Sequence, residues 1–338
     1  MKKIFTVCLI VLAVAAACIA AGCVAPEEDQ SGTALTIINS DGSVVKLAAE
    51  PQRIVLLNSN AGEILYLLGS ADKIIGISQS IANNAEQRRM YPDAAVVGTW
   101  NEPDVEYLVA QNADLVIGYA TSKPKNAEVL ASVGIPIVYI DCTKPATMAS
   151  DIREVGKLAG NTARADEIAA YYDEVMNTVA TAAQTVNEAD KKTVYAESYT
   201  AYYAQGTDSG MGQLISLTGG RNILQETGTP KVSDEWVVVS NPEVIIKLVN
   251  TMDHPEADLH ELSSRNGFDR IAAVASGDVS LIRNDITYGP RSCAAAVALL
   301  DILYPGQLPD LTAESVLAEF NSRFGTAFST NNLIYPAI

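Results

Sequence analysis

Two glutamates stand in nearly the same phrase at two places in the chain. Residues 106–117 read EYLVAQNADLVI and residues 235–246 read EWVVVSNPEVII, so Glu106 and Glu235 are each followed six residues later by Asn. An acid and three aliphatic residues then complete each phrase. A carboxylate accepts two hydrogen bonds from the planar fork of an arginine. The phrases predict two similar halves, each of which presents one glutamate at an equivalent place.

Aromatic side chains form a second group with a chemical use. Only 6% of the chain is aromatic, yet Trp100, Tyr119, Tyr199 and Tyr288 all fall in loops or at the ends of expected strands. Flat aromatic walls suit a large planar or semi-planar ligand with polar edges. Asn58 stands in a polar loop on the same expected edge. We therefore expect these residues to line one ligand site.

Arg291 begins an expected helix beside Tyr288. It has two interpretations: its guanidinium pairs with a carboxylate or another negative oxygen of the ligand, or it forms an internal salt bridge to an acid such as Asp285. Few other basic residues are expected near the ligand. A neutral or modestly charged ligand therefore fits better than a highly anionic one.

The remaining metal-binding residue types are few. The only histidines, His254 and His260, lie in the acidic segment 252–262, where His and carboxylate together suit Zn or Mn. A bare-metal site between the halves needs ligands from both, and the first half has no histidine, so we expect an acidic surface loop. Cys142 and Cys293 either pair with each other or remain isolated buried thiols.

The elements that position these residues alternate between strand and helix. Alternating elements with continuous aliphatic strands indicate parallel sheets covered by helices on both faces. Strands are expected at 53–57, 73–77, 95–97, 114–118 and 135–140, and the pattern restarts with strands at 192–198 and 278–283.

Residues 163–186 carry apolar residues at helical spacing and many good helix formers, which predicts one long helix between the two α/β regions. The sequence thus predicts an α/β fold of two lobes, each with a parallel sheet flanked by helices, joined by a single long interlobe helix. The expected N-terminal lobe covers 35–143, the interlobe helix region 144–191 and the C-terminal lobe 192–338.

The first residues indicate export. Residues 1–22 have a positive start, a long apolar stretch and small residues before Cys23, as in a secretory signal peptide. The Gly-Cys ending resembles a lipobox, in which Cys23 carries the lipid, and residues 23–34 then form a polar tether. The alternative is an anchor that stays in the membrane uncut.

Charge and motifs exclude other classes. The net charge of −17 repels phosphate backbones and argues against nucleic-acid binding. The sequence has no glycine-rich phosphate loop and no Gly-x-Ser-x-Gly nucleophile elbow. An enzyme acting on a small molecule in the cleft is retained as an alternative, as is a direct metal-ion-binding importer component.

Taken in order, the motifs resemble the solute-binding lipoproteins of ABC importers that capture ferric siderophores, haem and corrinoids. The resemblance covers nearly the whole chain after residue 34. It is carried by EPQRIVLLN (50–58), LLGSADKIIGIS (67–78), VGTWNEPDVEYLVAQNADLVI (97–117), VSDEWVVVSNPEVII (232–246) and YGPRS (288–292).

The resemblance implies a binding protein without catalytic residues or an intrinsic cofactor. It implies an iron chelate, haem or a corrinoid such as cobalamin as the ligand between the lobes. The implied partner is an ABC permease homodimer with its ATPase subunits, whose two copies meet Glu106 and Glu235 through arginines. The implied location is the outer face of the cytoplasmic membrane, where a monomer is held by the lipid on Cys23.

Overall fold

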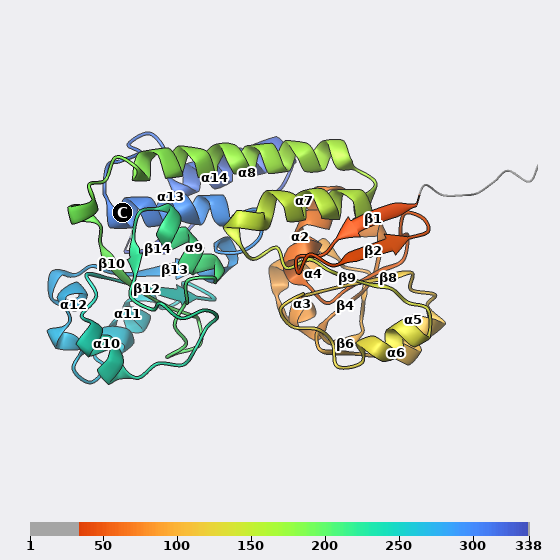
Figure 1. Ribbon diagram of the computed structural model, residues 1–338, viewed down its shortest axis with the longest axis horizontal. Helices are drawn as coiled ribbons and strands as arrows, with labels where there is room; N and C mark the ends of the chain where they lie inside the picture. Colours follow the sequence, from red (N-terminus) through yellow and green to blue (C-terminus); the bar gives the residue numbers. More distant parts are fainter. Residues whose placement is uncertain (1–33, 337–338) are drawn as a thin grey trace, which may run out of the picture.

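The first lobe is built on a five-stranded parallel sheet. The structure is a computed structural model that describes residues 34–336 (Figure 1). The central strands β3 and β8 each contain three consecutive aliphatic residues, and all of their residues are buried. The strand order is β5 (Ala95–Val96), β4 (Ile74–Ile77), β3 (Ile54–Leu56), β8 (Leu115–Gly118), β9 (Ile137–Tyr139).

The second lobe repeats this plan. Its sheet has the order β11 (Arg221–Asn222), β10 (Thr193–Glu197), β12 (Val244–Val249), β13 (Val279–Arg283), β14 (Ile334–Tyr335), and only β14 is antiparallel. The run β4-β3-β8-β9 of the first sheet thus corresponds to β11-β10-β12-β13 of the second. This shared topology confirms that the repeated phrases mark two similar halves.

Short helices cover the sheets, and two hairpins complete the first lobe. One hairpin around Gly42 pairs β1 (Leu35–Ile38) with β2 (Val44–Leu47), and a second one pairs β6 (Gly98–Thr99) with β7 (Glu102–Pro103). The first-lobe helices are α2 (Ser59–Leu67), α3 (Gln79–Asn83), α4 (Ala85–Met90), α5 (Val105–Ala110) and α6 (Ala127–Ser132). Those of the second lobe are α9 (Gly210–Leu217), α10 (Asp234–Ser240), α11 (Pro255–Ser263), α12 (Ala272–Ser276), α13 (Ser292–Leu303) and α14 (Ala313–Phe324).

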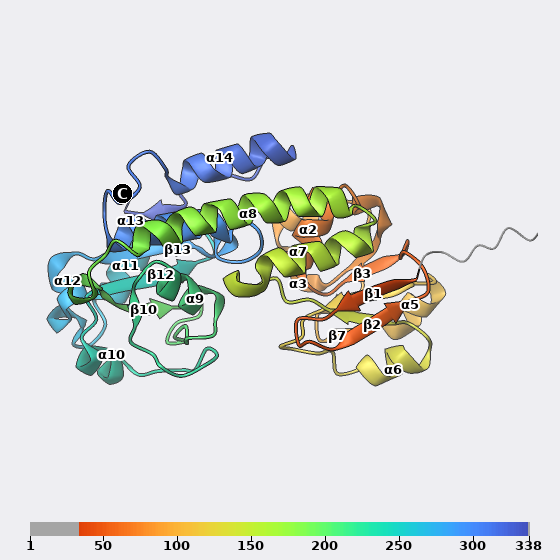
Figure 2. The same cartoon turned by 45° about the horizontal axis from the view of Figure 1, so that its top comes forward.

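A long helix joins the lobes. Helix α8 (Thr162–Ala183) runs along one side of both lobes, as Figures 1 and 2 show. It is preceded by α7 (Pro145–Ala159), which the sequence did not resolve as a separate helix, and Gly160 in the left-handed conformation ends α7. Helix α8 is braced by α14, since the Tyr171 hydroxyl donates to the Val316 carbonyl oxygen at 2.9 Å.

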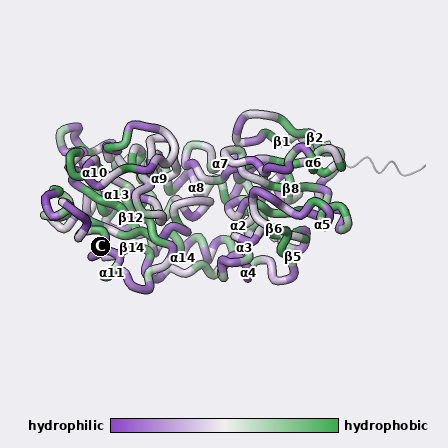
Figure 3. The backbone as a smooth tube through the Cα atoms, turned by 90° about the horizontal axis from the view of Figure 1, so that it is seen from below, coloured by the Kyte–Doolittle hydropathy of each residue, from purple (hydrophilic) through white to green (hydrophobic). Residues whose placement is uncertain are grey.

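One apolar core runs through both lobes. It includes Leu56 and Ile117 of the first sheet, Ile168 of α8, and Ile246 of the second sheet, all fully buried. Figure 3 shows hydrophobic backbone stretches passing through both halves, for example at β8 and β12. Because the core is continuous across the junction, α7 and α8 pack as part of both lobes rather than as a loose linker.

Candidate ligand-binding site

The topology places a crevice at the same point in each sheet. In the first lobe the chain moves outward in opposite directions from β3 and β8, and in the second lobe from β10 and β12. Ligands of open α/β sheets bind beyond the carboxyl ends of strands at such a point. Ser59 follows β3, Tyr119 follows β8, and Tyr199 follows β10. The edge that the sequence predicted is therefore present in both lobes.

Tyr119 is held in place by the first turn of α2. Its hydroxyl group lies 3.2 Å from the Ser59 hydroxyl and 3.3 Å from the Ser59 backbone nitrogen, which donates to it. Burial raises the pKa of Tyr119 above its ordinary value, so the hydroxyl stays protonated and able to donate. A neutral phenol fixed in this way presents a flat face and one polar edge.

Tyrosines of the two lobes come close together. Burial is the main reason that the pKa of Tyr288 is raised to about 12, and the charges of Tyr199 and Tyr119 contribute to this rise. Ala120, next to Tyr119, donates its backbone N–H to Asp141 Oδ1 at 2.8 Å, and Gly289, next to Tyr288, donates to the Cys142 carbonyl oxygen at 3.0 Å, so both tyrosines lie beside residues 141 and 142. Tyr288 also lies against the start of α9, beside Gly210. The structure thus brings Tyr119 and Tyr288 together from the two lobes, and it places Tyr199 at the carboxyl end of β10.

A pocket of about 250 Å³ opens at the carboxyl ends of β10 and β12, lined by Tyr199, Lys247, Asn250 and Arg265 among others. Behind it the buried Glu197 accepts hydrogen bonds from Lys247 Nζ at 2.7 Å and from Arg265 Nη1 and Nη2 at 2.7 and 2.9 Å. Burial opposes ionisation of Glu197, but Arg265 and Lys247 outweigh it and hold its pKa below the ordinary value. The two cations of this pocket are therefore already paired.

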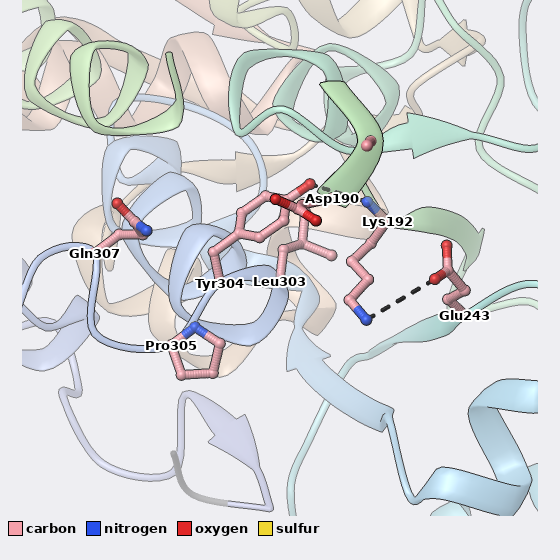
Figure 4. Close-up of a pocket in the computed structure, with 8 residues that line it drawn as sticks. Asp190, Lys192, Glu243, Leu303, Tyr304, Pro305 and Gln307 are labelled. Atoms are coloured by element: carbon pink, nitrogen blue, oxygen red, sulfur yellow. Dashed lines mark hydrogen bonds and ion pairs between the residues drawn. The ribbon is translucent and has the colours of Figure 1, made fainter. Parts of the chain in front are cut away.

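A larger pocket of about 460 Å³ lies elsewhere (Figure 4). Its lining includes Lys192 and Glu243, which directly precede β10 and β12 and lie 3.9 Å apart. The pocket therefore opens at the amino ends of β10 and β12, at the edge of the sheet opposite Tyr199. Size alone does not make it the ligand site, because the topological argument and the aromatic residues both point to the carboxyl ends.

Trp100 has a mixed environment. It stands in the turn between β6 and β7, is half-buried, and packs on the smaller core of the first lobe around Leu108 and Val97. Its contact with a ligand stays a prediction. Trp236, by contrast, packs edge-on against Tyr195 inside the second lobe, with ring centroids 6.4 Å apart.

Asn58 is fully buried, so its side chain is not exposed to the crevice. Its side-chain oxygen caps α2 by accepting from the backbone nitrogens of Asn60 and Ala61, at 2.8 and 3.2 Å. Its amide nitrogen donates to the carbonyl oxygen of Ile140. All of its hydrogen-bonding groups thus serve the backbone, and the prediction that Asn58 contacts the ligand is corrected to a structural role.

Arg291 is likewise committed inside the protein and is only 2% exposed. It donates to both carboxylate oxygens of Glu63, at 3.0 and 2.7 Å, and approaches Asp285 at 3.1 Å and Glu86 at 3.4 Å. Burial works to lower its pKa, but Glu63 and Asp285 raise it well above the ordinary value. Of its two interpretations, the structure has the internal salt bridge, and the expected contact with a ligand is corrected.

Glu106 and Glu235 occupy matching positions. Each is the second residue of its helix, α5 or α10, and each is exposed. Both helices begin with a side-chain cap, since Asp104 accepts from the Tyr107 nitrogen and Ser233 from the Trp236 nitrogen. Helices α5 and α10 lie on the side of the two lobes that faces away from α8 (Figure 1; Figure 2). In the described part of the chain, neither glutamate forms a salt bridge.

The segment with the histidines is largely helical rather than the expected loop. His254 precedes α11 and His260 lies in its last turn. Within residues 34–336, no group of three or more His, Cys, Asp or Glu residues is arranged to hold a metal ion. Cys142 and Cys293 are both buried and free, which matches the second of their two interpretations.

Cys23, the signal peptide and the tether lie outside the described residues. Between residues 34 and 336, no helix is both long and apolar enough to cross a membrane.

Two charged residues of this region were not predicted. Glu63 is the only charged residue in the apolar helix α2, and Glu197 ends the apolar strand β10. A single charged residue in an otherwise apolar helix or strand indicates a buried ion pair, because a buried charge requires a partner of opposite charge. The partners Arg291 and Arg265 are distant in sequence, so spacing does not reveal them.

Comparison with known proteins finds a matching family model and several similar proteins. The family model described as periplasmic binding protein matches residues 54–286. The chain is 25% identical to an uncharacterized ABC transporter substrate-binding lipoprotein, YvrC of Bacillus subtilis (strain 168), over 86% of this chain and 94% of that protein. It is 29% identical to a cobalamin-binding protein of Halobacterium salinarum over 80% of this chain and 67% of that protein. The TroA-like periplasmic binding protein FepB from Veillonella parvula has a similar fold, with a TM-score of 0.72 and 22% identity over 87% of this chain and 97% of that one.

Proposed function

The chain belongs to the periplasmic binding protein family, and from this premise we propose that it captures a solute in the cleft between its lobes and delivers it to an ABC permease. The two lobes with crevices at matching strand ends support this role. Its relatives named above are transport and binding proteins, so an enzyme acting in the cleft becomes the weaker alternative.

The ligand is a large, weakly charged chelate, and a corrinoid fits best. The observation that carries this proposal is that Tyr119 and Tyr288, from different lobes, both lie beside residues 141 and 142, with Tyr199 at the carboxyl end of β10. Phenol rings offer flat apolar walls and neutral hydroxyl groups rather than charge. Trp100 adds a fourth wall in this proposal.

Charge favours a corrinoid over a highly anionic iron chelate. Lys247 and Arg265 are paired with Glu197, and Arg291 is paired with Glu63. Pairing leaves these cations little capacity to compensate several negative oxygens on a ligand. The relative from Halobacterium salinarum is named as a cobalamin-binding protein, in keeping with this choice. Haem is the next candidate, because it is planar with only two carboxylates.

Delivery requires a fixed position on the importer. In our proposal, the lipid on Cys23 holds the exported monomer at the outer face of the membrane, and Glu106 and Glu235 each contact one subunit of the permease homodimer. Two carboxylates on separate lobes fix the orientation of the protein better than one, since each accepts the fork of one arginine.

The test is the visible spectrum of the full-length protein purified from a medium that contains cobalamin, haem and a ferric catecholate. The three ligands absorb differently, and we expect the corrinoid spectrum at a ratio of one ligand per protein. A colourless protein that binds none of the three in subsequent titrations would refute the proposal. Chemical conversion of the bound ligand by the protein alone would favour the enzyme alternative.

A further inference from the structure

The exposed apolar side chains of this protein include one on each of the two helices that carry the docking glutamates. Val239 on α10 is 84% exposed, the highest value for a large apolar side chain between residues 34 and 336, and Val109 on α5 is 47% exposed. A single exposed valine requires no explanation. Two of them on corresponding helices of the two lobes do, since each follows by one helical turn a glutamate that forms no salt bridge within residues 34–336.

Helix geometry places each valine beside its glutamate. Val109 follows Glu106 by three residues and Val239 follows Glu235 by four. Residues three or four apart are neighbours on one face of a helix. Each of these helices therefore presents a carboxylate and an aliphatic side chain together, on the side of the molecule away from α8 (Figure 1).

The first lobe extends its apolar surface onto the next helix. Val129 on α6 and Val133, which directly follows α6, are 49% and 47% exposed, while Leu130 between them is buried. Helix α6 is tied to the α5 region through Asn126, whose amide donates to the Pro103 carbonyl oxygen at 2.7 Å. The second lobe thus has one highly exposed valine, Val239. The first lobe has Val109, Val129 and Val133, whose side chains are each about half exposed.

We propose that Val109 and Val239 are apolar anchors for the permease, working beside Glu106 and Glu235. This inference rests on the proposed function and adds to it the kind of surface the permease must present: an arginine next to an apolar depression, once for each lobe. Charged contacts mainly set orientation and the rate of encounter, whereas a desolvated apolar contact slows dissociation. The acidic glutamates and the net charge of −17 fit a basic membrane partner and disfavour a second copy of this acidic chain.

The test compares single and double serine substitutions at the two valines. Serine removes the apolar group without adding a charge that would itself attract arginine. The full-length variants Val109→Ser, Val239→Ser and the double variant are titrated against the permease–ATPase complex of the same organism in nanodiscs. Val44→Ser is the matched control, because Val44 is 56% exposed in β2 and lies outside both helices. We expect about ten-fold weaker binding for each single variant, since burying a valine contributes roughly this factor. The control and the affinity for cobalamin stay unchanged.

The outcomes separate this inference from the function on which it rests. If Glu106→Arg and Glu235→Arg abolish binding to the complex while the valine variants bind as the wild type does, the apolar anchors are refuted and the docking role stands. If the glutamate variants also bind normally, the docking role is refuted as well. If the valine variants lose only self-association in sedimentation, the occupant is a second copy of the chain and the inference is overturned.

Discussion

Arg291 Nη2 lies 2.7 Å from Glu63 Oε2, and this buried ion pair joins the two lobes across 228 positions of sequence. Glu63 belongs to α2 in the first lobe, and Arg291 caps α13 in the second. The ring of Phe328 lies 4.3 Å from the guanidinium carbon. The pair therefore links the lobes directly beside Tyr288 and the proposed cleft.

Breaking this pair should destabilise the protein. In Glu63→Ala, Arg291 loses both bidentate hydrogen bonds while it stays buried, and such losses typically cost about 3–5 kcal/mol. Urea unfolding followed by circular dichroism measures the change. The control is Glu86→Ala, which removes the more distant and more exposed partner of Arg291 and should cost under about 1 kcal/mol. Equal effects of the two variants would contradict a special role for Glu63.

Gly210 should tolerate no side chain. A Cβ atom at this first residue of α9 would lie 2.4 Å from the Thr143 carbonyl oxygen, at the place where the chain leaves the first lobe. Backbone cannot give way there as a flexible side chain would, so Gly210→Ala should separate the lobes locally and weaken both stability and ligand binding. Thermal unfolding measures the first effect. Gly118→Ala is the control for an added Cβ atom, since Gly118 has no positive φ and a Cβ atom there would lie 3.6 Å from the Tyr139 ring, at ordinary van der Waals distance. An unaltered melting temperature for Gly210→Ala would show that Gly210 and Thr143 can move apart without loss of stability.

Asp151 predicts a pH dependence of stability. It lies buried in α7 and accepts from Ser40 Oγ, the Cys142 nitrogen and Thr147 Oγ1 at 3.1–3.2 Å. Burial raises its pKa from 3.8 to about 6. Between these values the folded protein keeps a proton that the unfolded chain releases. The contribution of Asp151 to stability is therefore largest below pH 4, falls as the pH rises towards 6, and is level above.

In Asp151→Asn this decline should be absent. The difference in unfolding free energy between wild type and variant should shift by about 3 kcal/mol from pH 4 to pH 7, because one pKa unit corresponds to about 1.4 kcal/mol. Urea titrations at several pH values provide the measurement, with the exposed Asp72→Asn as control. Parallel curves for the wild type and Asp151→Asn would rule out this assignment.

Charge reversal at Glu106 or Glu235 should strongly reduce transport without changing the affinity for ligand. Glu106→Arg and Glu235→Arg each place a cation opposite the expected permease arginine, which turns attraction into repulsion. Transport into proteoliposomes should drop at least ten-fold for each variant, while the affinity for ligand is retained. Glu314→Arg is the matched control, since Glu314 is an exposed acid in the first turn of α14, on the α8 side (Figure 2). Undiminished transport by the double variant would remove the docking role.

Much of the fold was predictable because it depends on local patterns. Continuous aliphatic runs place the inner strands, and the helical spacing of residues 163–186 corresponds to α8. The two halves were visible because the phrases at Glu106 and Glu235 fall on equivalent helix–strand pairs, α5–β8 and α10–β12. Helix α11 was missed because its acidic, weakly apolar sequence has no clear helical stripe.

The site was only partly predictable because its contacts are not local. Strand ends indicated correctly that Tyr119 and Tyr199 lie at the carboxyl edges of their two sheets. Asn58 and Arg291 were expected at the ligand because a polar residue at a strand end looks the same in sequence whether it faces a ligand or the backbone. Only the buried acceptors Glu63 and Ile140, more than 80 positions away from their partners, decide between the two.

The central claim is capture of a weakly charged chelate between aromatic residues of the two lobes, and isothermal titration with cobalamin tests it most directly. Tyr119→Ala and Tyr288→Ala should each weaken binding about ten-fold to a hundred-fold, because a packed aromatic side chain typically contributes about 1–3 kcal/mol. Tyr66→Ala, which removes an exposed tyrosine of α2, should bind as the wild type does. Wild-type affinity in both cleft variants, or weakening by Tyr66→Ala alone, would contradict the account.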